Sequence, residues 1–353
     1  MLDRRTGSIG LLLAVVSAAA FGTSGVFATA LLDAGWTAGS AVTVRMGVAG
    51  LALSVPAALQ LRGRWSLLRS NARAVLAFGA LAVALPQLAY FNAVGRLSVG
   101  VALLLEYSGV LLVVLWTWAR LGQRPSTVTG AGVVVAVGGL VLVLDVLSGA
   151  RIDPVGVVWG LVAALGLASY FVLSAHSDDA LPPLASAAAG LVVGALGLGA
   201  AALVRVVPWR TTAADVELAG RSTSWLVPVL GLALVAAALA YATGIAAVRR
   251  LGSRLSSFVG LSEVLFAVVA AWLALGQRPT VVQLVGGVVV LVGIVLVRLG
   301  DRPPVPALAA ADPVPAGAEG EPPRPADPVP AGAEGHASAP ASAPAVGQQP
   351  SVS

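Results

Sequence analysis

The chain has 353 residues, of which 58% are hydrophobic and 10% are charged, and its mean hydropathy is +0.92. A soluble domain of this size needs far more polar surface, so a water-soluble globular fold is excluded. The apolar runs are about 20 residues long, the length of a helix that crosses a hydrocarbon layer, whereas the strands of a membrane barrel alternate over about 10 residues. These features predict an all-α membrane protein.

The polar residues exclude several classes of function. Cysteine is absent and all 21 basic residues are arginine, so disulfides, thiolate metal sites and cysteine nucleophiles are excluded. The two histidines, His176 and His336, fall in a helix end and in the C-terminal tail, and no phosphate-binding glycine loop or metal-ligand cluster is present. The pI near 10.6 is interpreted as arginines close to lipid headgroups. We expect no enzyme activity, cofactor, metal or nucleic-acid partner.

Ten membrane spans are predicted along the chain. With the N-terminus inside, thirteen arginines fall in cytoplasmic segments and six in external ones, which favours both termini in the cytoplasm. The lack of lysine, together with abundant alanine, glycine, valine and proline, is typical of a GC-rich bacterial genome, so the bacterial cytoplasmic membrane is the expected location. The spans lie at residues 9–32, 38–61, 74–94, 99–120, 126–147, 154–175, 184–206, 224–248, 253–274 and 280–299.

The spans form two halves, residues 1–148 and 149–300, followed by a tail at 301–353. Leu-Gly-Gln-Arg-Pro occurs at 121–125 and again at 275–279, an offset of 154 residues. Each half has five spans, an odd number, so the halves are expected to insert with opposite orientation, as in many secondary transporters. The alternative is a duplicated helical bundle that transports nothing. The tail is rich in proline, alanine and glycine and is expected to be disordered.

Two helix segments resemble a known family. Residues 105–113, Leu-Glu-Tyr-Ser-Gly-Val-Leu-Leu-Val, look like the Glu-aromatic-x-Gly-Pro-Leu segment of the threonine/homoserine-exporter branch, and residues 261–264, Leu-Ser-Glu-Val, are similar to its Leu-Glu-Pro segment. Together with ten spans and the repeat, they make residues 9–300 resemble the EamA family of the drug/metabolite transporter superfamily. The resemblance implies two inverted five-helix halves and an amino acid or derivative as substrate.

The chain departs from the family pattern at four positions. Val110 and Val264 stand where the two segments usually carry proline. Gln123 and Gln277 stand where the superfamily usually ends each fourth helix with Leu-Gly-Glu. These departures bear on the substrate branch and leave the family resemblance in place.

Glu106 and Glu263 are the acids placed well inside predicted spans. A charge at membrane depth costs several kcal/mol, and such residues usually face a cavity or a partner. Arg45 lies seven residues into its span, as Glu106 does from the same side. We expect either an Arg45–Glu106 pair or a site in which Arg45 takes a substrate carboxylate and Glu106 its ammonium. Glu263 is the expected proton-coupling residue, with Glu106 as a second one; structural pairing of these groups is the alternative.

Four further residues complete the predicted substrate site. Gln87 and Tyr90 follow Pro86, which can kink a helix toward a cavity. Tyr241 occupies a roughly corresponding place in the second half, and Ser262 precedes Glu263. Aromatic rings with polar tips suit a wall around an amphipathic metabolite, although packing or an interfacial position accounts for them equally well.

The sequence therefore predicts a secondary transporter that exports a small metabolite, with an amino acid or derivative as leading substrate through the resemblance. Proton-coupled alternating access is the expected mechanism. Export of hydrophobic cations is an alternative, because buried glutamates would serve it equally well. A non-transporting scaffold that recruits partners through the tail, and a membrane enzyme built on the two glutamates alone, are the alternatives from other classes. The oligomeric state stays open.

Overall fold

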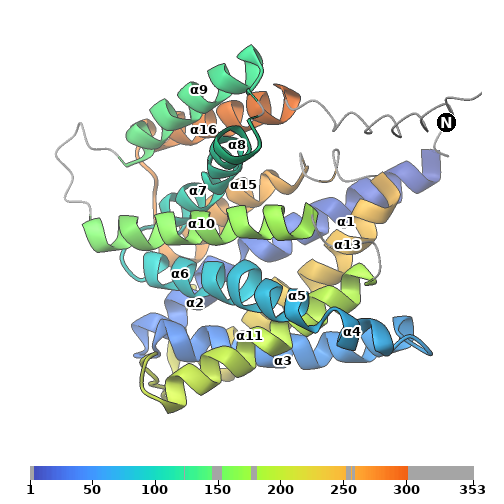
Figure 1. Cartoon of the computed structure of the whole chain (residues 1–353). Coiled ribbons are helices and arrows are strands. Elements are labelled where there is room, and N and C mark those ends of the chain that lie inside the picture. The colour runs from blue at the N-terminus through green and yellow to red at the C-terminus, as the bar shows by residue number, and fades with distance from the viewer. Residues whose placement is uncertain are drawn as a thin grey trace, which may run out of the picture. The chain divides into compact units, whose positions relative to one another are not determined.

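The computed structural model describes residues 4–122, 124–144, 153–175, 181–251, 256 and 259–300, and most of them are helical (Figure 1). The tail at 301–353, both histidines, Gln123 and the join between the halves near residue 148 lie outside these residues. The elements are α1 (Arg4–Gly22), α2 (Ser24–Asp33), α3 (Ala38–Gln60), α4 (Ser66–Ser70), α5 (Ala72–Ala77), η1 (Phe78–Ala84), α6 (Leu85–Val94), α7 (Val99–Tyr107), α8 (Gly109–Leu121), α9 (Thr127–Val143), α10 (Pro154–Ala175), α11 (Pro183–Leu203), β1 (Val216–Leu218), β2 (Arg221–Thr223), α12 (Leu226–Leu230), η3 (Gly231–Leu239), α13 (Ala240–Leu251), α15 (Ser262–Leu275) and α16 (Val281–Gly300).

Eight helical segments among the described residues have the length and apolar composition needed to cross a membrane. Two further predicted spans correspond to shorter apolar helices, α9 and α15. Both were predicted to be longer: α9 stops close to the edge of the described range at residue 144, and α15 begins only after a turn at Leu261. The protein is a multi-pass helical membrane protein. The eight segments are Ser8–Asp33, Ala38–Gln60, Ala72–Val94, Val99–Arg120, Pro154–Leu173, Pro183–Leu203, Leu226–Leu251 and Val281–Gly300.

Two of the long helices widen into π-helix at matching places. In the first of these helices, α5, η1 and α6 begin at residues 72, 78 and 85. In the second, α12, η3 and α13 begin at residues 226, 231 and 240. The differences are 154, 153 and 155 residues, which agrees with the offset of the Leu-Gly-Gln-Arg-Pro repeat. Sequence analysis expected a kink at Pro86; the structure instead has a π segment directly before it. π segments are rare and occur frequently at functional sites.

The predicted span of Glu106 contains a turn two residues after the glutamate. Ser108 forms a turn between α7 and α8, and its hydroxyl donates a 2.6 Å hydrogen bond to the carbonyl of Leu105. A serine that bonds back to its own helix bends it. A turn at Leu261 likewise comes directly before α15, two residues from Glu263. The predicted span around Glu106 is thus confirmed as Val99–Arg120, with a one-residue turn at Ser108 inside it.

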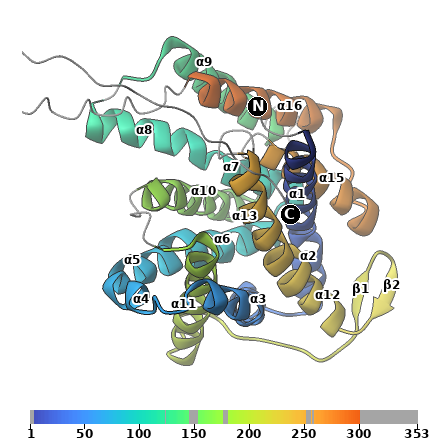
Figure 2. The same cartoon turned by 90° about the vertical axis from the view of Figure 1, so that its right-hand side faces the viewer.

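Helices α9 and α16 lie side by side (Figures 1 and 2) and pack backbone against backbone. A Cβ added at Gly132 would lie 2.7 Å from the backbone nitrogen of Val297, and one added at Gly286 would lie 2.6 Å from that of Val143. With the repeat offset of 154 residues, Gly286 is the counterpart of Gly132 and Val297 is the counterpart of Val143. Each of the two contacts is therefore the counterpart of the other, with α9 and α16 interchanged. This reciprocity is that of an interface with two-fold symmetry.

A β-hairpin formed by β1 and β2 packs against α2 through β1 (Figure 2). Strands β1 and β2 pair antiparallel, and Ala219 and Gly220 between them both have positive φ, as a two-residue type I′ turn requires. Trp36 is 6% exposed, donates from Nε1 to the carbonyl of Thr212 at 3.0 Å, and stacks near Trp225. Trp36 is therefore buried against the segment that precedes the hairpin.

Candidate functional site

Arg45 lies in α3 and is buried, with 5% of its surface exposed. Its Nη1 donates to Ser24 Oγ of α2 and its Nη2 to the carbonyl of Ala236 in η3, both at 2.9 Å. The guanidinium also lies over the ring of Phe91, 5.6 Å from the centroid. Arg45 Nε has no hydrogen-bond partner. The side chain therefore joins an N-terminal helix pair to the π segment of the second half.

Glu106 lies one residue before the end of α7 and is half-buried. Among the described residues, no group donates a hydrogen bond to its carboxylate, and Arg45 forms no ion pair. The direct Arg45–Glu106 pair is thus not formed in this structure, because the guanidinium is engaged by Ser24 and Ala236. Arg45 and Glu106 are nevertheless close enough to interact electrostatically.

Glu263 lies in the first turn of α15 and is bound by a residue of the other half. The hydroxyl of Tyr107, the last residue of α7, donates to Glu263 Oε2 at 3.0 Å and lies 3.4 Å from the carbonyl of Gly260. Hydrogen bonds to charged groups are stronger than those between neutral groups. Sequence analysis quoted Tyr107 in a motif and gave it no role; its position directly after Glu106 was the available signal.

The other predicted residues differ in what holds them. Tyr90 is 6% exposed and makes an edge contact with Phe91, and Tyr241 is half-buried with its ring 5.1 Å from that of Phe21. Gln87 has a buried Oε1 atom without a hydrogen-bond partner. Ser262 donates to the carbonyl of Val259, across the turn at Leu261, at 2.6 Å, so its hydroxyl hydrogen is already used by the backbone.

Five of these side chains form one cluster, which we call the carboxylate cluster. Arg45 interacts electrostatically with each of the other four. They come from α3, α6, α7, α13 and α15, and hence from both halves of the chain. Two carboxylates, two phenols and one guanidinium can bind a small molecule that carries an ammonium group and polar atoms. The members are Arg45, Tyr90, Glu106, Tyr241 and Glu263.

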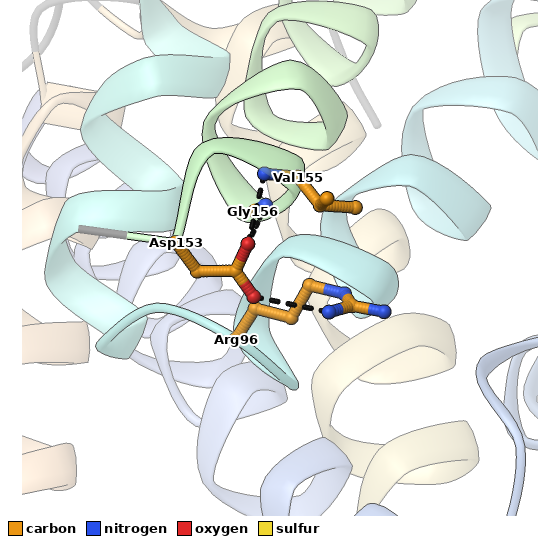
Figure 3. Close-up of polar contacts among 4 residues, drawn as sticks. All are labelled: Arg96, Asp153, Val155 and Gly156. Atoms are coloured by element: carbon orange, nitrogen blue, oxygen red, sulfur yellow. Dashed lines mark hydrogen bonds and ion pairs between the residues drawn. The ribbon is translucent and has the colours of Figure 1, made fainter. Parts of the chain in front are cut away.

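Arg96 and Asp153 form the one ion pair seen among the described residues, apart from this cluster (Figure 3). Arg96 Nη1 lies 3.0 Å from Asp153 Oδ2, while Asp153 Oδ1 accepts from the backbone nitrogens of Val155 and Gly156 at the start of α10. The hydrogen bond from Arg96 is the main cause that lowers the pKa of Asp153, with the two backbone donors adding to it. The pair caps α10 and fixes it to the turn after α6.

The sequence of each half matches the same family model, the EamA-like transporter family, at residues 8–145 and again at 154–299. The chain belongs to this family. One solved chain, described only as "Crystal structure of protein", has a TM-score of 0.55 at 19% identity, covering 84% of this chain and all of the other, so it supports the fold alone. A search of curated proteins finds no match.

The family assignment establishes a multi-pass membrane transporter built of two repeats. The carboxylate cluster draws its members from both matched regions, 8–145 and 154–299. In transporters built from repeats, substrate sites lie at the interface between the repeats. The cluster is therefore the candidate substrate site.

Proposed function

We propose that the protein exports a small metabolite with an ammonium group, an amino acid or a derivative, by proton-coupled alternating access. The observation that carries this proposal is the half-buried Glu106 carboxylate, which no described residue binds. A carboxylate at membrane depth without a partner is costly, and a cationic group of a substrate would stabilise it. The threonine/homoserine-exporter resemblance around residues 105–113 and 261–264 supports an amino acid.

The roles within the cluster follow from its contacts. Glu106 would bind the substrate ammonium, with Tyr90, Tyr241 and Gln87 as neighbours. Arg45 has one unbound nitrogen, Nε, and two engaged ones, so it would reach a substrate carboxylate only by exchanging one of its protein acceptors. Glu263, which Tyr107 binds across the halves, would exchange the proton.

The membrane arrangement belongs to the same proposal. We take α9 and α15, with the eight long segments, as ten spans in two inverted five-helix repeats with both termini in the cytoplasm. Residues 1–148 and 149–300 would be the repeats, and 301–353 a dispensable cytoplasmic tail. The π segments at matching offsets and the reciprocal contacts of Gly132 and Gly286 support the repeat.

The inversion has a direct test, because the natural chain contains no cysteine. Single cysteines in place of Arg124 and Arg278 occupy equivalent positions of the two Gly-Gln-Arg-Pro loops. A membrane-impermeant maleimide added to intact cells should label the cysteine at position 278 and not the one at 124. Labelling of both from the same side would contradict an inverted repeat while leaving the family assignment intact.

Transport is tested by flux into and out of proteoliposomes under an imposed pH gradient, with labelled amino acids as substrates. The variants are Glu106→Gln and Glu263→Gln, and Glu217→Gln in the exposed hairpin is the matched control. Glu106→Gln should abolish substrate binding. Glu263→Gln should lose gradient-driven flux and keep exchange. Wild-type flux in both variants would show that the two acids are structural and that this site assignment is wrong.

Export of organic cations is the second candidate function. It is favoured by the charge of the cluster, in which two carboxylates face one guanidinium whose terminal nitrogens already bind protein acceptors. The same proteoliposomes distinguish the candidates when lipophilic cations replace amino acids. A scaffold without transport is separated by deletion of residues 301–353, which should leave flux unchanged in a transporter.

A further inference from the structure

Four arginines gather between the end of α3 and the first turn of α5. Arg62, Arg64, Arg69 and Arg73 are all exposed, and Trp65 between them is 54% exposed. Arg64 donates to the carbonyl of Gln60 at 3.1 Å, and none of the four is paired with an acid among the described residues. Arginine and tryptophan beside the end of a membrane helix are typical of the lipid headgroup layer.

Few acidic side chains lie near these four arginines to neutralise their charge. The described residues include six acids, of which Glu106 and Glu263 lie within spans. The other four lie at the opposite helix ends or beside and within the hairpin: Asp33 ends α2, Asp153 precedes α10, and Asp215 and Glu217 lie at β1. Within the described part of the chain, the four arginines therefore form an uncompensated positive surface. We call it the α4 cluster.

An apolar groove begins beside the α4 cluster. It has a volume of about 590 Å³ and lies between the helix that contains η1 and helix α11. Leu76, Ala80 and Ala84 line one wall and Val193 and Gly197 the other. Arg73 precedes Leu76 by three residues and Ala80 by seven, a spacing that places them on one helix face. Arg73 and the groove residues Leu76 and Ala80 therefore lie along the same face of this helix.

The dimensions of the groove fit one lipid leaflet. On the helix of α5, η1 and α6, the lining residues run from Leu76 to Leu88, at most about 18 Å at 1.5 Å per residue. Half of a hydrocarbon core of about 30 Å is about 15 Å. Gly197 leaves the groove open, because a Cβ added there meets nothing within 4 Å.

We propose that the α4 cluster and the groove form a binding site for an anionic phospholipid, with its phosphate on Arg69 and Arg73 and an acyl chain along η1 and α11. Each basic residue near a membrane surface contributes about 1 kcal/mol of attraction to an anionic lipid. The positive-inside excess assigns the site to the cytoplasmic leaflet. This site is separate from the carboxylate cluster and does not rest on any transport activity.

The test is native mass spectrometry of the full-length protein in detergent, titrated with phosphatidylglycerol and with phosphatidylcholine of the same acyl chains. The headgroup variant is Arg69→Gln with Arg73→Gln, and its control is Arg249→Gln with Arg250→Gln, which removes the same charge from the end of α13. The groove variant is Gly197→Leu, and its control is Gly138→Leu in α9, where an added Cβ also meets nothing within 4 Å.

The wild type should bind phosphatidylglycerol more tightly than phosphatidylcholine. The headgroup variant should weaken phosphatidylglycerol binding about thirtyfold, which corresponds to two basic residues, and lysine at both positions should restore most of it. Gly197→Leu should weaken binding about tenfold, with both controls within about twofold of the wild type.

Three results would overturn the proposal. Equal losses in the headgroup variant and in its Arg249/Arg250 control would show diffuse attraction without a site. Equal affinity for the two lipids would show an apolar groove that selects no headgroup. Displacement of the lipid by inorganic phosphate at millimolar concentration would show a site for the free anion. Because the arginine and glycine variants act on separate parts of the site, misfolding of one leaves the other informative.

Discussion

The hydroxyl of Tyr107 donates a 3.0 Å hydrogen bond to Glu263, and this bond joins α7 of the first half to α15 of the second. Both residues lie beside helix interruptions, Tyr107 directly before the turn at Ser108 and Glu263 two residues after the turn at Leu261. Helix ends at membrane depth supply free backbone groups in discontinuous transporter helices. The bond therefore connects the two regions that match the family model, at the ends of two helices.

Replacing Tyr107 by phenylalanine removes this bond and keeps the ring. A hydrogen bond to a charged group contributes roughly 1.5–3 kcal/mol, so we expect gradient-driven flux in proteoliposomes to fall about tenfold or more. Thr117→Val is the control, since it removes a hydroxyl that, among the described residues, bonds only to the carbonyl of Val114 in its own helix. Unchanged flux in Tyr107→Phe would show that the contact is dispensable.

Arg45 is predicted to stabilise the fold in addition to any role toward substrate. Lysine keeps the charge but cannot donate from two terminal nitrogens held in a planar fork, so Arg45→Lys loses the bond to Ser24 or to Ala236. We expect the free energy of unfolding to fall by about 2 kcal/mol, measured by thermal unfolding in detergent. The exposed Arg249→Lys serves as control. A stable Arg45→Lys variant that has lost substrate binding would instead assign the guanidinium to the ligand.

Much of the candidate site follows from the sequence, because a carboxylate or guanidinium inside an apolar run is unusual in itself. Glu106, Glu263 and Arg45 were found in this way, and in the structure Arg45 interacts electrostatically with both acids. The partners of Arg45 were not predictable. One is a backbone carbonyl of η3, and a π segment made of glycine, leucine, alanine and valine carries no local signal that separates it from an α-helix.

Contacts between the halves also lie beyond what the sequence specifies. The bond from Tyr107 to Glu263 spans 156 residues and depends on how α7 and α15 cross. The repeat at an offset of 154 was visible in identical residues, yet Gly260 rather than Glu263 stands opposite Glu106 in that register. Tertiary packing decides which side chain faces the other half, and periodicity alone does not.

The Arg96–Asp153 pair predicts a dependence of stability on pH. Because Arg96 and two backbone donors lower the pKa of Asp153, the native state favours the ionised carboxylate. The resulting stabilisation is present above the ordinary pKa of Asp, 3.8, and is lost as the pH falls through the lowered value. The unfolding temperatures of the wild type and of Asp153→Asn should differ at pH 6, and the difference should shrink below about pH 4.

In an Arg96→Gln background, the effect of Asp153→Asn on the unfolding temperature should be smaller. A difference that is constant from pH 6 to pH 3 would contradict this account.

The reciprocal glycine contacts between α9 and α16 predict that equivalent substitutions cost equal stability. Alanine at Gly132 would place its Cβ 2.7 Å from the backbone nitrogen of Val297, and alanine at Gly286 would place its Cβ 2.6 Å from that of Val143. Backbone atoms cannot rotate away, so the helices must separate, at a cost of about 1–3 kcal/mol for each variant. Gly138→Ala in α9 is the control, since its Cβ meets nothing within 4 Å and alanine favours helix; it should unfold at the same temperature as the wild type or higher. If one of the two variants unfolds like the wild type while the other loses stability, the two halves do not pack by the pseudo-symmetry that their contacts show.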